Sequence, residues 1–233
     1  ASSLLMWNPQ MKFLEPHFQL LRYDIRGHGR SEAPPGAYTL ELLGEDAVAL
    51  LDILEIERVL WIGLSMGGMI GQSIALNYPK RLQSLALCDT MAIVPEEAQP
   101  IWQERIDAVR ENGVGSQLEP TMERWFTPSF LKLNPYMLGV IRKEFLGTPA
   151  QGYLGCIYAI RKLNYLDRLS EIKVPALIMV GEDDPGTPVS ASEAMHERIP
   201  NSKLVIIRSA RHLSNVEQPE VFNTNLLAFL KRV

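Results

Sequence analysis

The segment Gly63–Gly68 (Gly-Leu-Ser-Met-Gly-Gly) constrains the fold of this chain more than any other stretch, because it directly follows the apolar run Val59–Ile62. In a Gly-x-Ser-x-Gly sequence the backbone turns from strand to helix within a few atoms. This turn strains the serine and leaves no room for Cβ atoms two positions to either side. Gly63 and Gly67 meet this requirement. The segment therefore predicts a nucleophile elbow that presents Ser65 as an attacking group.

The residues after the elbow favour this interpretation. Met69–Leu76 have the apolar spacing of a helix, and Asn77-Tyr78-Pro79 ends that pattern. Strand, turn and helix thus occur in the order that the motif needs. Small residues also cluster by chance, so a plain turn without a chemical role is the alternative interpretation of the pentapeptide taken alone.

Length and composition limit the classes of protein to which the chain can belong. Its 233 residues are 46% hydrophobic and 21% charged, which fits a single α/β domain with one sizeable core. A net charge of −4 provides no basic surface for nucleic acid. No apolar run reaches the roughly 18 residues that cross a bilayer, and no signal peptide is recognisable. We expect a soluble, cytoplasmic protein without nucleic-acid or membrane partners, and a homo-oligomer is compatible with the sequence.

Of the two cysteines, Cys88 lies in an apolar strand pattern and Cys156 in a helical region. This position predicts buried, reduced thiols rather than a disulfide framework. Neither cysteine has the spacing of a metal ligand, so we expect no metal site.

Short β-type runs alternate with helical patterns along most of the chain. This alternation predicts an α/β fold with a mostly parallel sheet and helices on both faces. The predicted strands are Phe18–Tyr23, Val59–Ile62, Leu82–Cys88, Ala176–Val180 and Leu204–Ile207.

The alternation stops between Asp89 and Pro175, where several helical segments and many aromatic residues occur without a convincing strand. Turn signals divide this stretch into about four short helices. We interpret residues 91–172 as a helical cap inserted between two parts of a sheet domain, residues 1–90 and 173–233. Such caps roof an active site and influence substrate choice. The alternative for each aromatic residue is that it only attaches the cap to the core.

A serine hydroxyl needs a base within hydrogen-bond reach, and the chain has four histidines. His17 precedes the first predicted strand, His28 lies in a glycine-flanked loop and His196 lies within a helical pattern, so all three favour structural or surface roles. His212 follows the last predicted strand, where an α/β-hydrolase sheet delivers its base. We therefore predict His212 as the base.

The third member of a triad should follow the preceding strand, where Glu182, Asp183 and Asp184 stand in a row. Asp184 is our choice, because it sits where the turn reverses and prolines stiffen the loop that follows. Asp183 remains the alternative, and the carboxylates that do not face the imidazole would belong to a solvated turn. The order serine, aspartate, histidine is that of the α/β-hydrolases.

Several segments together resemble the 3-oxoadipate enol-lactonases, a family of α/β-hydrolases, and the resemblance spans nearly the whole chain. The elbow and the loop that contains Arg26–Ser31 are common to many α/β-hydrolases, whereas the strand end Leu87–Thr90 and the loop His212–Glu217 are more particular to lactonase-like members. The segments are Met6–Gln10, Leu21–Ser31, Gly63–Met69, Leu87–Thr90, Arg124–Thr127 and His212–Glu217.

The resemblance implies hydrolysis of a small five-membered enol-lactone with a carboxymethyl side chain, without metal or cofactor. It implies attack by Ser65 with His212 as base, and an oxyanion held in part by the backbone N–H of Met66. Trp125 would line the pocket. A cation should pair with the free carboxylate of the substrate, and we assign this role to Arg161, for which a surface position is the alternative.

Family members have strands before the segment that matches Met6–Gln10, and the loop just upstream of it carries the second oxyanion donor. This chain starts at Ala1. We expect it to be a fragment of a longer protein, and the alternative is a truncated form that lacks one donor.

Two other functional interpretations of the same residues stay open. The triad determines acyl transfer and not the acyl group, so a carboxylesterase or a cofactor-free perhydrolase of the same fold is one alternative. A non-catalytic binder with a hydrolase fold is the other.

Overall fold

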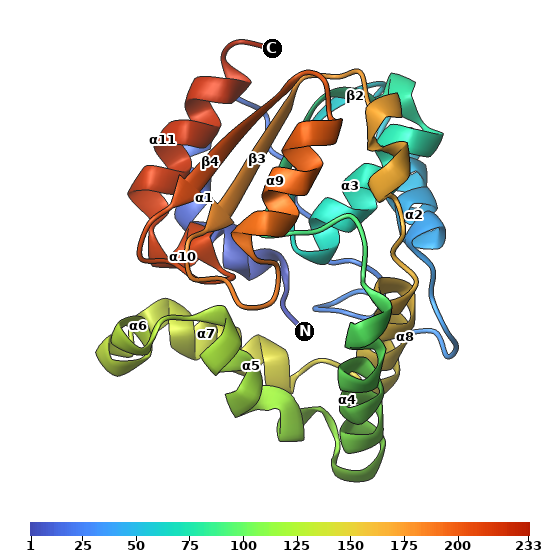
Figure 1. The fold of residues 1–233 in the computed structure, drawn as a ribbon, viewed down its shortest axis with the longest axis vertical. Helices are drawn as coiled ribbons and strands as arrows, with labels where there is room; N and C mark the ends of the chain where they lie inside the picture. Colours follow the sequence, from blue (N-terminus) through green and yellow to red (C-terminus); the bar gives the residue numbers. More distant parts are fainter.

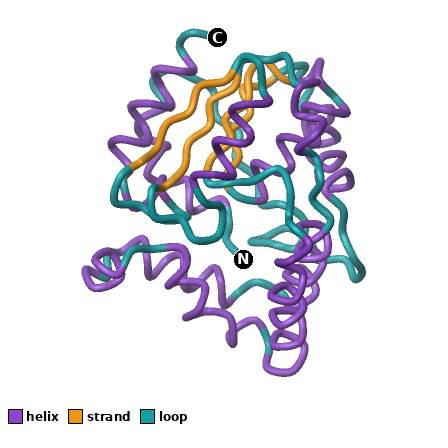
Figure 2. Tube along the Cα trace, viewed as in Figure 1, coloured by secondary structure: helices purple, strands orange, loops and turns teal.

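The computed structural model describes residues 1–233, which form one parallel sheet flanked by helices (Figure 1; Figure 2). The sheet has four strands in the order β1-β2-β3-β4, and every neighbouring pair is parallel. The last four predicted strands are therefore confirmed, with small changes at their ends. Their bounds are Val59–Leu64 for β1, Leu82–Cys88 for β2, Ala176–Gly181 for β3 and Ser202–Ile207 for β4.

The first predicted strand, Phe18–Tyr23, does not form. Residues 19–24 make no backbone-to-backbone hydrogen bond, and β1 pairs only with β2. A strand exists through its ladder of hydrogen bonds to a neighbour, so a run with strand-like composition stays irregular when no neighbour pairs with it.

Helices cover both faces of the sheet, as the alternation predicts. On one face, α3 contacts β1 and β2, α9 contacts β3 and β4, and α2 packs on α3. On the other face, α11 contacts β3 and β4, and α1 packs on α11 (Figure 1). The bounds of these helices are Asn8–Leu14 for α1, Leu40–Ile53 for α2, Met66–Asn77 for α3, Val189–Arg198 for α9 and Pro219–Leu230 for α11. The short helix α10, Ser214–Glu217, directly precedes α11.

The central strand β2 shows why both faces need covering. Leu85 and Leu87 belong to the core between the sheet and α2, α3 and α9, whereas Ala86 and Cys88 belong to the core on the other face. Successive side chains of a strand point to opposite faces, so an apolar run of this length buries residues on both.

The chain between β2 and β3 is helical apart from one isolated bridge between Ile93 and Asn164. In Figure 1 α5, α6 and α7 lie below the sheet, and α4 and α8 stand side by side. This segment contains five α-helices and three 3-10 turns. They are η3 (Glu96–Ala98), α4 (Gln99–Asn112), η4 (Val114–Gln117), α5 (Leu118–Trp125), α6 (Pro128–Leu133), α7 (Tyr136–Leu146), α8 (Ala150–Arg161) and η5 (Leu166–Glu171).

This helical segment shares a core with one face of the sheet. Met122, Phe126 and Phe145 are fully buried in the same apolar cluster as Leu177 and Met179 of β3. The shared cluster fixes the position of the helices over the ends of the strands. None of the helices in the structure has the length and apolar character needed to cross a membrane.

Candidate active site

Ser65, Asp184 and His212 meet at the carboxyl ends of the strands, each in the segment that follows a strand. The Nε2 atom of His212 lies 2.8 Å from Ser65 Oγ, and its Nδ1 atom lies 2.7 Å from Asp184 Oδ2. The structure therefore brings together three residues that are far apart in the sequence, in the geometry of a nucleophile, a base and the acid that orients the base.

The turn at Ser65 has the strained backbone that the motif predicts. Ser65 has φ 52° and ψ −117°, in the positive-φ region that side-chain-bearing residues rarely adopt. A Cβ atom on Gly63 would lie 2.1 Å from the carbonyl oxygen of Gly67, so position 63 admits only glycine. On Gly67 a Cβ atom would meet nothing within 4 Å, whereas on Gly68 it would lie 2.7 Å from the side chain of Thr90. The second crowded glycine of the elbow is thus Gly68, and the prediction for Gly67 is wrong.

The helix that follows the serine offers a positively polarised end. Met66 is the first residue of α3, so its N–H has no partner within the helix. The carbonyl of Ser65 accepts from Gly68 N, Met69 N and Thr90 Oγ1, which fixes the peptide that leads into the helix. The N–H of Met66 and the dipole of α3 are therefore available to a negative charge that develops beside Ser65.

Asp184 is held by its own loop. Its Oδ1 accepts from Gly186 N (2.8 Å) and Thr187 N (3.1 Å), and its Oδ2 accepts from Thr187 Oγ1 (2.5 Å) as well as from His212. Burial alone would raise the pKa of Asp184, but the charge of His212 and these hydrogen bonds lower it below the ordinary value. Asp184 therefore stays ionised beside the imidazole.

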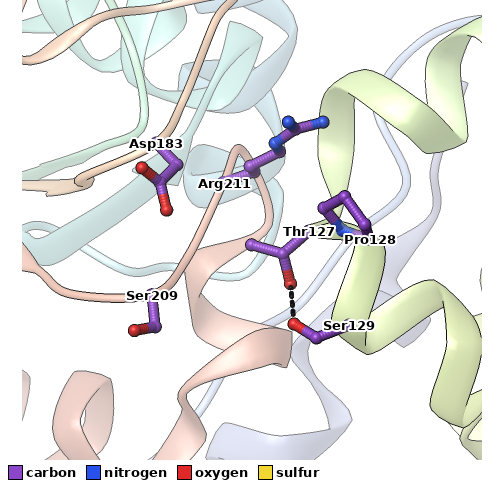
Figure 3. A pocket seen from close by; sticks show the side chains of 6 residues that line it. All are labelled: Thr127, Pro128, Ser129, Asp183, Ser209 and Arg211. Carbon is purple, nitrogen blue, oxygen red and sulfur yellow. Dashed lines mark hydrogen bonds between the residues drawn. The ribbon is translucent and has the colours of Figure 1, made fainter.

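The neighbouring carboxylates do not reach the imidazole. Glu182 and Asp183 are exposed. Asp183 lines a polar cavity of about 490 Å³, and Figure 3 shows it there with Ser209 and Arg211. Of the three carboxylates in the row, Asp184 is the one that contacts His212.

His212 is nearly buried, with 7% of its surface exposed. Burial lowers its pKa, but the charge and hydrogen bond of Asp184 outweigh this, so the pKa of His212 lies above its ordinary value. The ring of Trp125 stacks on the imidazole with 6.2 Å between centroids and an angle of 26°. Trp125, at the end of α5, thus lies against the imidazole.

The other three histidines lie elsewhere. His28 is buried, with Nδ1 3.8 Å from Cys156 Sγ, and burial is the first of the causes that lower its pKa to about 3. His196 bonds Ser202 Oγ, and His17 packs against Phe18. None of these three histidines forms a hydrogen bond with Ser65.

Asp89 is a buried carboxyl group next to the site that the sequence did not single out as functional. It follows β2 with φ 43°, and its Oδ1 accepts from Gly181 N (2.8 Å) and its Oδ2 from Ser214 Oγ (2.6 Å). Burial raises the pKa of Asp89 to about 8, although the charge of His212 opposes this. The sequence could have identified Asp89 by its position at a strand end of the same parallel sheet.

Three arginines of the helical segment differ in their partners. Arg161 donates to Gln99 Oε1 (2.8 Å) and Gln103 Oε1 (2.9 Å), and no contact joins it to the residues around Ser65. Arg124 donates only to Thr121 Oγ1 (2.7 Å), and Arg105 lies with its guanidinium 4.6 Å from the ring centroid of Trp102. Neither Arg105 nor Arg124 forms an ion pair with a carboxylate. The sequence analysis did not identify Arg105 or Arg124, because a sequence does not show whether a side chain lacks an ion-pair partner.

A sequence model of the alpha/beta hydrolase fold matches residues 1–219. The chain belongs to the α/β-hydrolase family. It is 36% identical to 3-oxoadipate enol-lactonase 2 of Acinetobacter baylyi, over 100% of this chain and 86% of that protein.

Solved structures agree with this assignment. The crystal structure of the enol-lactonase from Burkholderia xenovorans LB400 has 35% identity and a TM-score of 0.95, over 99% of this chain and 87% of that one. A thermophilic esterase from Thermogutta terrifontis has 31% identity and a TM-score of 0.93, over 99% of this chain and 86% of that one. This α/β hydrolase is therefore similar to enol-lactonases and to an esterase.

The crowding at the elbow predicts different outcomes for two glycines of the elbow of this α/β hydrolase, Gly63 and Gly67. Gly63→Ala should destabilise the fold by roughly 1–3 kcal/mol or more, because the new Cβ overlaps a backbone carbonyl that cannot move freely. Gly67→Ala should be tolerated, because its Cβ meets open space. Thermal unfolding of the two variants measures this, and equal unfolding temperatures would contradict the geometry.

The buried carboxyl of Asp89 predicts a pH-dependent stability. Its pKa rises from 3.8 to about 8 on folding. Between these values the unfolded chain has released a proton that the folded chain keeps, so this group makes the fold less stable as pH rises. Asp89→Asn mimics the protonated group, and the unfolding temperature of the wild type should fall relative to that variant between pH 5 and about 8. A constant difference across this range would argue against the raised pKa.

Proposed function

We propose that this α/β hydrolase is a serine hydrolase that opens 3-oxoadipate enol-lactone to 3-oxoadipate through an acyl-enzyme. The observation that carries the proposal is the chain of hydrogen bonds from Asp184 through His212 to Ser65. Similarity to enol-lactonases over the whole chain supports the choice of substrate.

In the first half of the proposed reaction, Ser65 Oγ attacks the lactone carbonyl carbon, and its proton passes to Nε2 of His212. Asp184 keeps the imidazole in the correct tautomer and stabilises its positive charge. The N–H of Met66 stabilises the oxyanion. The ring C–O bond then breaks, the enol oxygen takes the proton from His212, and the acyl group stays on Ser65.

In the second half, water attacks the acyl carbon while His212 takes its proton. The bond to Ser65 Oγ breaks, and the proton on His212 returns to that oxygen. The acid is released as a carboxylate, and its enol tautomerises to the ketone. In this proposal residues 91–172 act as a cap, and Trp125 closes the site over His212.

The free carboxylate of the substrate requires a cation, and we assign this role to Arg124 of α5 with Arg105 of α4. Burial, followed by the charge of Arg105, lowers the pKa of Arg124 to about 10, although the charge of Glu123 opposes this. Two like charges therefore lie near each other, and neither forms an ion pair with a carboxylate. Arg124 also acts on the pKa of His212 and adjoins Trp125, which stacks on that ring. A carboxylate ligand would relieve the repulsion and form charge-assisted hydrogen bonds. Arg161, whose donors already meet two amide oxygens, is replaced in this role.

A carboxylesterase is the second candidate function. The similarity to the Thermogutta terrifontis esterase favours it. The same three residues would then transfer the acyl group of a neutral ester. The ratio of kcat/KM for the enol-lactone to that for p-nitrophenyl acetate distinguishes the two functions, and a preference for the neutral ester would favour the esterase.

Substitutions in the triad test the mechanism. Ser65→Ala should abolish turnover and labelling by a fluorophosphonate without unfolding the protein. Asp184→Asn should lower kcat about 10⁴-fold, because the imidazole loses the acceptor that sets its tautomer. Asp183→Asn is the matched control, since its carboxylate is exposed, and its kcat should stay near that of the wild type. The reverse ranking of the two Asn variants would reject Asp184.

Substitution of Arg124, which forms no ion pair with a carboxylate, tests the substrate class. Arg124→Gln should lower kcat/KM for the enol-lactone about 10- to 100-fold, as expected for a lost hydrogen bond to a charged group. The rate with p-nitrophenyl acetate, which has no carboxylate, should change little. Arg161→Gln is the control and should leave both rates unchanged. A fall of both rates in Arg124→Gln, or of the lactone rate in Arg161→Gln, would contradict the assignment.

A further inference from the structure

The loop that carries His212 is bonded on both sides of the histidine to the junction between α5 and α6. Leu213 N donates to the carbonyl of Trp125 at 3.1 Å. On the other side, Arg211 N donates to Glu217 Oε2 at 2.6 Å. The side chain of Arg211 also reaches the carbonyls of Glu123 and Phe126. The histidine itself therefore sits between two anchored neighbours.

Glu217, the last residue of α10, connects the two parts. Its Oε1 accepts from the backbone N (2.9 Å) and from Oγ1 (2.7 Å) of Thr127, while its Oε2 accepts from Arg211 N. Thr127 is the residue before α6, and its hydroxyl also caps that helix by accepting from Phe130 N. One carboxylate thus joins the backbone beside His212 to the start of a helix in the cap.

The three donors explain why a carboxylate occupies this place. Two N–H groups and one hydroxyl converge on Glu217, and a carboxylate has only acceptors to offer them. A glutamine would turn an NH₂ group toward one of the N–H donors. No cation forms an ion pair with Glu217. Burial raises its pKa, although these hydrogen bonds and the charge of Arg211 oppose this. Its partners are the N–H and O–H groups of the two segments that it joins.

We infer that Glu217 is a positioning residue for His212, which holds the base at the correct distance from Ser65 by clamping its loop to the α5–α6 junction. The inference rests on the proposed triad. Trp125 belongs to the same junction and stacks on the imidazole, so one set of contacts sets the positions of both the His212 imidazole and the Trp125 ring. A shift of the base by about 1 Å can cost about 10²-fold in rate even when the substitution is away from the reacting atoms.

The test compares Glu217→Ala with Glu217→Gln, and Glu220→Ala serves as the matched control because Glu220 is exposed on the next helix. The measurements are the rate of fluorophosphonate labelling of Ser65, kcat and KM for p-nitrophenyl acetate, and the unfolding temperature. Glu217→Ala should lower kcat and the labelling rate about 10²-fold with a much smaller change in KM, because the displaced base acts in the chemical step. Glu217→Gln should show a smaller fall, and Glu220→Ala none.

A lower unfolding temperature with unchanged kcat would mean that Glu217 only stabilises the fold, and a rise in KM alone would mean that it only shapes the pocket; either result overturns the inference. If Glu217→Ala does not fold, Thr127→Val and Thr127→Ser test the clamp from the other end. Thr127→Val should lower kcat, whereas Thr127→Ser should keep kcat near that of the wild type. Equal kcat values for the two variants would overturn the inference. Absence of labelling in the wild type defeats the proposed function, whereas equal labelling of wild type and Glu217→Ala defeats only the clamp.

Discussion

The buried contact between Asp184 and His212 is the interaction on which the rest of the site depends. The side chain of Asp184 is inaccessible and that of His212 is 9% exposed, so a charge on either would be costly without a partner. Hydrogen bonds from the loop after β3 and the charge of the imidazole offset this cost. The pKa of the acid falls and the pKa of the base rises, and both shifts favour the ionised pair.

The parallel sheet provides the place where this pair can meet a nucleophile. Because all four strands run in the same direction, the segments after β1, β2, β3 and β4 gather at one edge. Ser65, Asp89, Asp184 and His212 each come from one of these segments. The crowded turn at Gly63 then aims the serine at the imidazole, and the start of α3 leaves the N–H of Met66 without an intrahelical partner.

The helices between β2 and β3 complete the site through contacts with other elements of the fold. They share an apolar cluster with one face of the sheet, and the residues around Thr127 bond to the loop of His212. Arg105 and Arg124 of these helices form no ion pair with a carboxylate, which supports the proposed carboxylate substrate. Glu217 and Arg211 belong to the same connection, so the proposed clamp and the proposed pocket are parts of one arrangement.

The sequence by itself determined the elements whose signals are local. The elbow, the four strands and the helical character of residues 91–172 depend on spacing within a few residues, and the alternation of strands and helices predicted a mostly parallel sheet, whereas the order of the strands came from the structure. The tertiary structure alone decided what depends on distant partners. It left Phe18–Tyr23 without a neighbouring strand, turned Asp184 toward the imidazole, gave Arg161 two glutamines and left Arg124 without a carboxylate. Pairing and burial decide such features, and both arise only when segments far apart in the chain come into contact.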